Sequence, residues 1–280
     1  GEWMLVTLFE NNQGVFKNIT QGSGLENTAG WYYSIAAHDF DNDGDQDFVA
    51  GNLGLNYKYK ASQEEPFVVF SHDFDGNGQL DIVLGYHEHG ELYPLRGKSC
   101  STDQIAGLKQ QFPTFESFGE ANLEDVYGAQ LDEALQYEAK TFASSYIENL
   151  GDGSFKVVPL SNEAQFSSIN NILVEDFNGD SHLDLLISGN LYAAEIETPR
   201  NDAGMGLLLT GDGKGNFDPV PLSESGFFAP HDAKDMKMIM VGKGNTKKRV
   251  VLVANNQYWL QAIEHIPGIT ERESQLTSLE

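Results

Sequence analysis

The chain has 280 residues, enough for one large or two ordinary domains with a sizeable core, which excludes a metal-stapled mini-protein. Its 42 acidic and 17 basic residues give a formal charge of −25, and we expect no binding to nucleic acid or to an anionic membrane surface, since both require a positive footprint. The apolar runs are all far shorter than the roughly 20 residues that cross a bilayer as a helix, so we also expect no membrane insertion.

The first predicted element is a hairpin in which a Gly-containing turn is followed by phenylalanine. It reads Leu8-Phe-Glu-Asn-Asn-Gln-Gly-Val-Phe16, and the same order returns in residues 147–155 and 208–217. Glycine beside Asn or Asp supplies the positive φ that a tight hairpin requires. Because residues 4–10 already have the pattern of a strand, we expect residues 1–20 to be the outer half of a sheet whose beginning is missing, within a larger polypeptide.

Three acidic nine-residue segments form a second repeat, and the first and third of them follow a Phe hairpin at a nearly constant interval. Residues 39–47, 73–81 and 176–184 all fit the pattern D-x-[DN]-x-[DN]-x-x-x-D. Each segment precedes a short apolar run that ends in glycine, which is typical of a buried strand. The recurrence predicts a repeat architecture.

Oxygen ligands at alternate positions of a short loop suit a hard cation that takes six to eight oxygens, which is the preference of Ca²⁺. Positions 1, 3, 5 and 9 supply side-chain oxygens and position 7 its backbone carbonyl. We therefore expect about three calcium sites, with these ligands: Asp39, Asp41, Asp43, Asp47 and the carbonyl of Asp45; Asp73, Asp75, Asn77, Asp81 and the carbonyl of Gln79; Asp176, Asn178, Asp180, Asp184 and the carbonyl of His182.

Position 6 of the loops needs a sharp turn. Gly44 and Gly78 occupy it in the first two loops, and Ser181 replaces the glycine in the third. A helical EF-hand is excluded, because it requires a bidentate Glu at position 12, where this chain has Ala50, Leu84 and Ile187. The alternative for each loop is an acidic turn that holds no metal.

Short strands at this spacing, about four per unit, fit the blades of a β-propeller better than a solenoid or a sandwich. We expect blades at about residues 31–86, 91–160, 169–222 and 232–265. Residues 232–235 are expected to occupy the loop position of the last blade, where the missing downstream Asp implies that no ion binds.

Residues 101–140 interrupt the strand pattern. A polar residue ahead of apolar positions, as at Asn122, predicts capped helices, so we expect a small helical insertion in an all-β protein. This insertion is either a binding appendage or a cap that packs over a blade.

Enzyme-like features are few. His87 and His89 have the spacing that places two imidazoles on one face of a strand, where a third ligand would complete a zinc site. Aromatic residues at 31–33 and 57–59 either stack on sugar rings or pack between blades. The chain has no nucleophile elbow and no P-loop, and its one cysteine, Cys100, forms no internal disulfide. Catalytic residues are not predicted.

The acidic loops between strands and the Gly-Asp-Gly-x-Phe hairpins together resemble the FG-GAP/VCBS repeats of integrin α-subunit propellers and of secreted bacterial VCBS proteins related to cartilage acidic proteins. The resemblance covers nearly the whole chain except residues 101–140. It implies an extracellular or cell-surface propeller with calcium in its hairpins, used for non-catalytic adhesion or recognition of a protein or glycan. Ser181, residues 232–235 and the low blade count depart from the pattern.

Two alternatives to a recognition module remain. Some propellers are polysaccharide lyases or glycosidases, and the abundant acidic residues leave that activity open. The chain also fits a structural spacer within a large secreted protein, because a fold does not fix a function.

Overall fold

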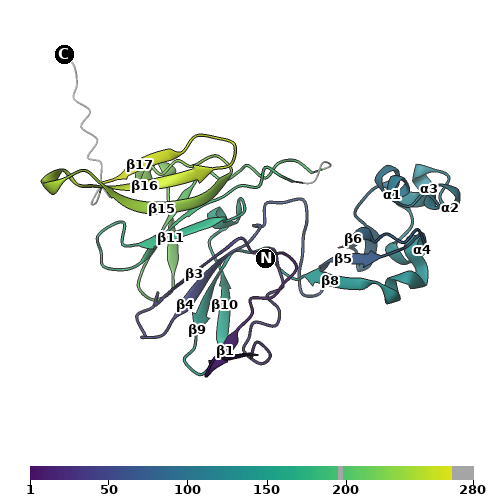
Figure 1. Cartoon of the computed structure of the whole chain (residues 1–280), viewed down its shortest axis with the longest axis horizontal. Coiled ribbons are helices and arrows are strands. Elements are labelled where there is room, and N and C mark those ends of the chain that lie inside the picture. The colour runs from purple at the N-terminus through teal and green to yellow at the C-terminus, as the bar shows by residue number, and fades with distance from the viewer. Residues whose placement is uncertain (195–197, 267–280) are drawn as a thin grey trace, which may run out of the picture. The chain divides into compact units, whose positions relative to one another are not determined.

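The computed structural model describes residues 1–194 and 198–266 (Figure 1). The protein is mostly β-strand, arranged in several small antiparallel sheets, which confirms the β-rich class. None of the described helices has both the length and the apolar character to span a membrane.

Contacts divide the chain into two compact units. The insertion unit comprises Gly1–Leu8, Glu26–Trp31 and Tyr59–Phe142. The main unit comprises Phe9–Leu25, Tyr32–Lys58 and the described part of Ala143–Glu280.

The first sheet of the main unit joins two distant parts of the sequence. Its order is β10-β9-β4-β3, formed by β3 (Ser34–His38), β4 (Asp47–Gly51), β9 (Ser145–Asn149) and β10 (Phe155–Pro159). The expected blades at 31–86 and 91–160 are therefore wrong, because β4 pairs with β9 and not with the next strand along the chain. Most of the segment between β4 and β9, Tyr59–Phe142, belongs to the insertion unit.

The second sheet of the main unit is consecutive in sequence. It consists of β11 (Asn171–Glu175), β12 (Asp184–Ser188), β13 (Leu207–Gly211) and β14 (Phe217–Val220), in that order. These strands fall within the range 169–222 expected from the sequence. The short helices η2 (Asn162–Gln165) and α5 (Leu222–Ser225) precede and follow this sheet.

The third sheet has only three strands, β15 (Ala233–Val241), β16 (Lys248–Asn255) and β17 (Gln261–His265). Residues 232–235 lie at the start of β15 and not in a hairpin loop, so their expected position is wrong. The β15–β16 connection spans residues 242–247, includes η3 (Gly244–Thr246) and carries lysines in place of acids. The expected hairpin loop was misplaced because Asp232 lies just before β15, whereas the hairpin loop of this sheet follows β15.

A small hairpin, β1 (Phe9–Asn12) and β2 (Val15–Asn18), completes the main unit. Its turn residues, Gln13 and Gly14, both have positive φ, 52° and 90°, as the sequence predicted for a tight turn. Every residue of both strands is exposed.

Neighbouring sheets of the main unit share apolar cores. One cluster combines residues of the first and second sheets, and another combines the second and third sheets. Their main members are Phe40, Val49, Tyr146, Leu185 and Leu209 in the first cluster, and Leu186, Phe227, Met236, Val251 and Val253 in the second. The burial of both faces explains why β12 reads as a continuous apolar run.

The insertion unit has its own sheet, ordered β7-β6-β5-β8. Its strands are β5 (Phe67–His72), β6 (Asp81–Glu88), β7 (Glu91–Pro94) and β8 (Leu135–Ala139). Residues 135–139, which were expected to be helical, are thus a strand. They pair with β5 and form an edge strand of the sheet.

The helices between β7 and β8 are α1 (Lys98–Gln104), α2 (Leu108–Gln111), α3 (Phe115–Gly119), α4 (Leu123–Tyr127) and η1 (Gly128–Glu133). Thr114 and Asn122 close capping boxes at the starts of α3 and α4, which explains where these helices begin. Their apolar residues pack on the β5 and β6 face in one buried cluster, and Figure 1 shows the helices gathered beside this sheet. The helical segment therefore covers a sheet.

Candidate metal centres

The three acidic segments are the turns of three β-hairpins. They connect β3 to β4, β5 to β6 and β11 to β12, and in each the ninth residue begins the second strand. The last pairs before the loops are His38 with Asp47, His72 with Asp81 and Glu175 with Asp184. Three segments far apart in sequence thus hold their candidate ligands at the same place in the strand pair.

The three loops also share one backbone path. Positions 4 and 6 have positive φ in every loop: 64° and 100° at Asn42 and Gly44, 73° and 86° at Gly76 and Gly78, 86° and 75° at Gly179 and Ser181. Ser181 adopts the left-handed conformation of the glycine that it replaces, so the third loop keeps the turn.

A common set of hydrogen bonds closes each loop around the carboxylate at position 1. The backbone N–H of position 6 donates to that carboxylate, from Gly44 to Asp39 at 3.2 Å, from Gly78 to Asp73 at 2.8 Å and from Ser181 to Asp176 at 3.0 Å. The N–H of position 7 donates to the side chain at position 5, from Asp45 to Asp43 at 3.0 Å, from Gln79 to Asn77 at 2.8 Å and from His182 to Asp180 at 2.8 Å. These shared bonds involve the N–H groups of positions 6 and 7. The carbonyl of position 7, the predicted backbone ligand, takes no part in them.

The aspartate at position 9 anchors the loop to the protein interior. Its Oδ2 accepts the backbone N–H of the phenylalanine at position 2 in all three loops, namely Phe40, Phe74 and Phe177. Its Oδ1 accepts a hydrogen bond from a group outside the hairpin. The N–H of Asn149 donates to Asp47, the N–H of Gly211 to Asp184 and Nε2 of Gln104 to Asp81. In the main unit the donor is the end of the third strand, whereas α1 supplies it in the insertion unit.

The predicted ligand side chains converge in two loops. Oxygens of Asp39, Asp41 and Asp43 lie within 4.8 Å of one another, and so do those of Asp73, Asp75 and Asp81. Asp47 is absent from the first group, because its oxygens face the N–H groups of Phe40 and Asn149 and the hydroxyl of Tyr146. In the third loop the amide of Asn178 donates to Asp180 at 2.9 Å, which places these two predicted ligands side by side.

The first loop carries uncompensated negative charge. Oδ1 of Asp39 and Oδ1 of Asp45 are shielded from solvent without a hydrogen-bond donor in the described structure. Burial and the neighbouring carboxylates raise the pKa of Asp41 and of Asp45. A bound cation would relieve this repulsion, and carboxylate oxygens are suited to a hard cation.

The other two loops differ from the first in their electrostatics. Backbone N–H groups of the loop, that of Gly78 foremost, lower the pKa of Asp73. Burial raises the pKa of Asp184, against the effect of three backbone N–H donors. The negative charge of Asp73 in the second loop is therefore stabilised by backbone N–H groups without an ion, unlike the charges of the first loop.

The histidine pair does not form the expected arrangement. His87 lies on β6, where its Nδ1 is 2.9 Å from the carbonyl of Pro66, but His89 falls in the β6–β7 turn with φ of 53°. The two imidazoles therefore do not share a strand face. The groups of three or more candidate metal ligands in the described residues consist of aspartates alone.

The aromatic residues near position 31 are part of a core. Trp31 is buried, and its ring contacts those of Trp3, Tyr59 and Phe142 within the insertion unit. Trp31 therefore packs in the core of the insertion unit and is not exposed for stacking on a sugar ring.

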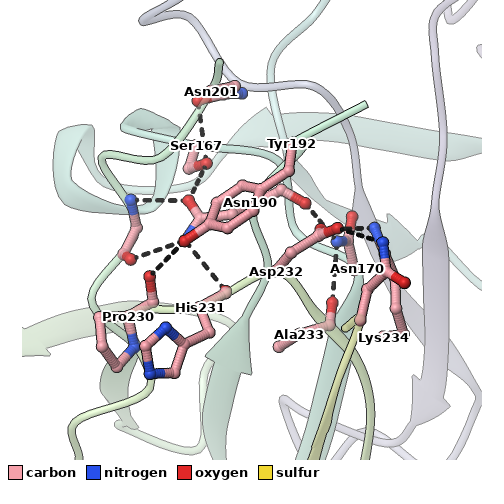
Figure 2. A network of polar contacts seen from close by, with 12 residues as sticks. Ser167, Asn170, Asn190, Tyr192, Asn201, Pro230, His231, Asp232, Ala233 and Lys234 are labelled. Atoms are coloured by element: carbon pink, nitrogen blue, oxygen red, sulfur yellow. Dashed lines mark hydrogen bonds and ion pairs between the residues drawn. The ribbon is translucent and has the colours of Figure 1, made fainter. Parts of the chain in front are cut away.

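A polar network that the sequence reasoning missed lies at the opposite ends of the strands from the acidic loops (Figure 2). Asn190 is 0% exposed, and its Oδ1 accepts from the Ser167 hydroxyl at 2.7 Å and from the Gly204 N–H at 2.9 Å. Its Nδ2 donates to the carbonyls of Gly204, Pro230 and His231. One side chain thus ties the segments before β11, before β13 and before β15.

A sequence signal for this network exists. Gly189-Asn190-Leu191 repeats Gly51-Asn52-Leu53, and both asparagines follow the second strand of an acidic hairpin. Asn52 is also fully buried, and its amide donates to the carbonyl of Ala143. The repeated Gly-Asn-Leu marks the structural ends of the two sheets.

Aromatic side chains are exposed near the third sheet. We call this surface the aromatic platform, and it consists of Phe228, His231, Tyr258, Trp259 and Leu260. The Tyr258 and His231 rings lie 3.8 Å apart, Gln261 donates to the carbonyl of Phe228, and Trp259 is 77% exposed. Contiguous exposed apolar patches on a protein surface mark interaction sites, which makes the aromatic platform a candidate binding surface.

No family model matches the chain, and no curated protein is significantly similar to it.

Proposed function

We propose that this chain is a calcium-stabilised β-propeller of the FG-GAP/VCBS type, or a large part of one, and that it acts as a non-catalytic recognition module outside the cell. The observation that carries the proposal is the common geometry of the three acidic hairpins, which agree in strand position, backbone path and hydrogen bonds. Repetition at this level of detail indicates a shared role for the three loops.

Calcium suits these loops because their side chains offer oxygens alone. Asp39, Asp41 and Asp43 already lie close together, and the first loop contains buried carboxylate oxygens without donors. Bound Ca²⁺ would supply positive charge that stabilises the hairpin turn. Millimolar calcium is found outside cells, where extracellular sites with dissociation constants near 10⁻⁴ M are loaded.

The propeller is supported by the order of strands. Sheets of four strands, each with an acidic loop between the first two and a Phe hairpin as the last two, occur twice in the main unit. Adjacent sheets bury apolar faces against each other, as blades do. The resemblance of the two motifs to FG-GAP/VCBS repeats supports the same architecture and an extracellular location.

The calcium proposal predicts a stability effect that depends on the metal. Asp41→Ala together with Asp43→Ala should remove the ion from the first loop and lower the stability in 1 mM calcium by about 1.4 kcal/mol, or roughly 3–5 °C in Tm. In chelator the same variant should melt at or above the temperature of the parent, because fewer carboxylates repel one another. Calorimetry in both media measures the difference.

The matched control is Asp132→Ala with Glu133→Ala, which makes the same charge change at exposed positions in η1. Its Tm should respond equally in calcium and chelator. An equal loss in both media for the loop variant would show that the loop is a turn without metal.

The recognition proposal is tested by a binding screen against extracellular glycans and matrix proteins in millimolar calcium, with a parallel chelator series. We expect calcium-dependent binding without turnover. Trp259→Ala should weaken a hit on the aromatic platform by at least about tenfold, since buried aromatic anchors carry much of the binding energy. Phe115→Ala, at an aromatic residue exposed in α3, should leave it unchanged.

Two other outcomes would contradict the recognition module. Cleavage of a bound glycan would establish a carbohydrate-active enzyme. Absence of binding throughout, by a chain that still takes up calcium, would leave the structural spacer.

A further inference from the structure

The hairpin β1–β2 has two counterparts in the main unit, β9–β10 and β13–β14. All three have the same order of strand, Gly-containing turn and phenylalanine. Their registers correspond, since Phe16 pairs with Asn11, Phe155 with Asn149 and Phe217 with Gly211. The likeness between β1 and β9 extends to sequence, where Glu10-Asn11 matches Glu148-Asn149.

Each counterpart is the outer half of a four-stranded sheet. Strand β9 pairs with β4 and strand β13 pairs with β12, and both of these partners begin at position 9 of an acidic loop. The backbone N–H of Asn149 donates to Oδ1 of Asp47 at 2.8 Å. The backbone N–H of Gly211 donates to Oδ1 of Asp184 at 2.9 Å.

The β1–β2 hairpin lacks this inner half. Within the described residues β1 pairs only with β2, and the two strands form a sheet by themselves. Phe16 is 67% exposed, whereas Phe155 and Phe217 are half-buried. A two-stranded sheet of exposed residues has little independent stability in water.

The free edge of β1 presents the same donor as its counterparts. A two-residue turn closes with a hydrogen-bonded pair, here Asn12 and Val15. Pairs alternate along an antiparallel ladder, so the next pair, Asn11 with Phe16, does not exchange bonds and the N–H of Asn11 points away from β2. Asn149 stands at the same place, and its N–H does reach a partner, Asp47.

We infer that the free edge of β1 binds the second strand of a further acidic-loop hairpin, with the N–H of Asn11 donating to the carboxylate at loop position 9. The three such hairpins in this chain already have neighbours, because β4 pairs with β9, β6 with β7 and β12 with β13. The occupant is therefore a fourth hairpin of the same chemistry, presented by another polypeptide segment. It covers Phe16 and turns β1–β2 into a four-stranded sheet.

The test uses a peptide probe with the sequence of residues 33–51, closed into a hairpin by a disulfide between added terminal cysteines. This sequence is chosen because its natural partner, β9, is the strand most like β1. The labelled chain is titrated with the probe in 2 mM calcium, and amide chemical shifts are recorded. We expect saturable shifts centred on residues 9–12.

Two chain variants separate the N–H from the side chain. Asn11→Pro removes the N–H and should weaken probe binding by about tenfold or more, the effect of one charge-assisted hydrogen bond. Asn11→Ala keeps the N–H and loses only the side-chain oxygen that accepts the Gly14 N–H within the turn, so it should bind far closer to the parent than Asn11→Pro does. A probe with Asn at its ninth loop position should bind less tightly to the parent and to Asn11→Ala, because both keep the N–H. This comparison keeps the test decisive should Asn11→Pro fail to fold.

Three results would overturn the inference. They are absence of shifts with a folded probe at millimolar concentration, shifts away from β1, and self-association of the chain through β1 that Asn11→Pro abolishes. The last result would assign the edge to a second copy. None of these readouts depends on whether the chain's own loops bind calcium, so failure here is distinguishable from failure of the proposed function.

Discussion

Asp47→Ala should lower the free energy of unfolding by about 3–5 kcal/mol in chelator. Asp47 is 0% exposed, and its carboxylate accepts the N–H of Phe40, the N–H of Asn149 and the hydroxyl of Tyr146. Alanine would leave three donors without an acceptor, of which those of Phe40 and Tyr146 are buried and that of Asn149 is half-buried, and a buried donor without an acceptor costs about 1–3 kcal/mol. Because the three donors come from the loop, β9 and the end of β9, their loss should loosen β4 from β9.

The measurement is denaturant unfolding followed by circular dichroism, with the slope checked for two-state behaviour. Asp47→Asn keeps one carbonyl oxygen and should lose less stability than alanine. Asp43→Ala, at an exposed loop position, should change stability little in chelator. A loss below about 1 kcal/mol for Asp47→Ala would show that the loop anchor is not structural.

Asn190→Leu should be comparably destabilising, by about 3–5 kcal/mol, although Asn190 is not one of the predicted metal ligands. Leucine is close to asparagine in size but can neither accept from Ser167 and Gly204 nor donate to the carbonyls of Gly204, Pro230 and His231. Asn190 and Ser167 are buried and the other partners are half-buried, so water replaces few of the lost bonds. The effect should be the same in calcium and in chelator.

The control for this variant is Asn56→Ala. Asn56 is exposed and donates a single bond, to the carbonyl of Phe166 at 3.2 Å, so its loss should stay within about 1 kcal/mol. Comparable losses for both asparagines would contradict the role assigned to the Asn190 network.

Local patterns predicted the segments but not all of their partners. The acidic loops, the Phe hairpins and the cap of α4 at Asn122 depend on a few neighbouring residues, so the sequence displays them directly. The pairing of β4 with β9 depends on two edges separated by the whole insertion unit, and neither edge is marked in its own sequence. Strands tend to pair with sequential neighbours, and that rule led to the wrong blades at 31–86 and 91–160.

The candidate metal sites could likewise be predicted only in part from the sequence. The candidate ligands follow from spacing, whereas the anchoring of Asp47, Asp81 and Asp184 requires donors whose position only the fold reveals. Asn190 was overlooked because a single asparagine between a strand and a loop is ordinary in sequence. Its importance comes from the three chain segments that meet around it.

The position of the insertion between β4 and β9 has a consequence for folding order. The β3–β4 hairpin leaves the ribosome roughly 90 residues before β9, and at about 5–20 residues per second that is a wait of roughly 5–20 s. During this time the edge of β4 that later pairs with β9 has no strand beside it. Strands β5 to β8 and their helices lie closer together in sequence and can assemble in the meantime. We therefore expect the insertion unit to become protected from hydrogen exchange first, and closure of the first sheet to be the slow, aggregation-sensitive step.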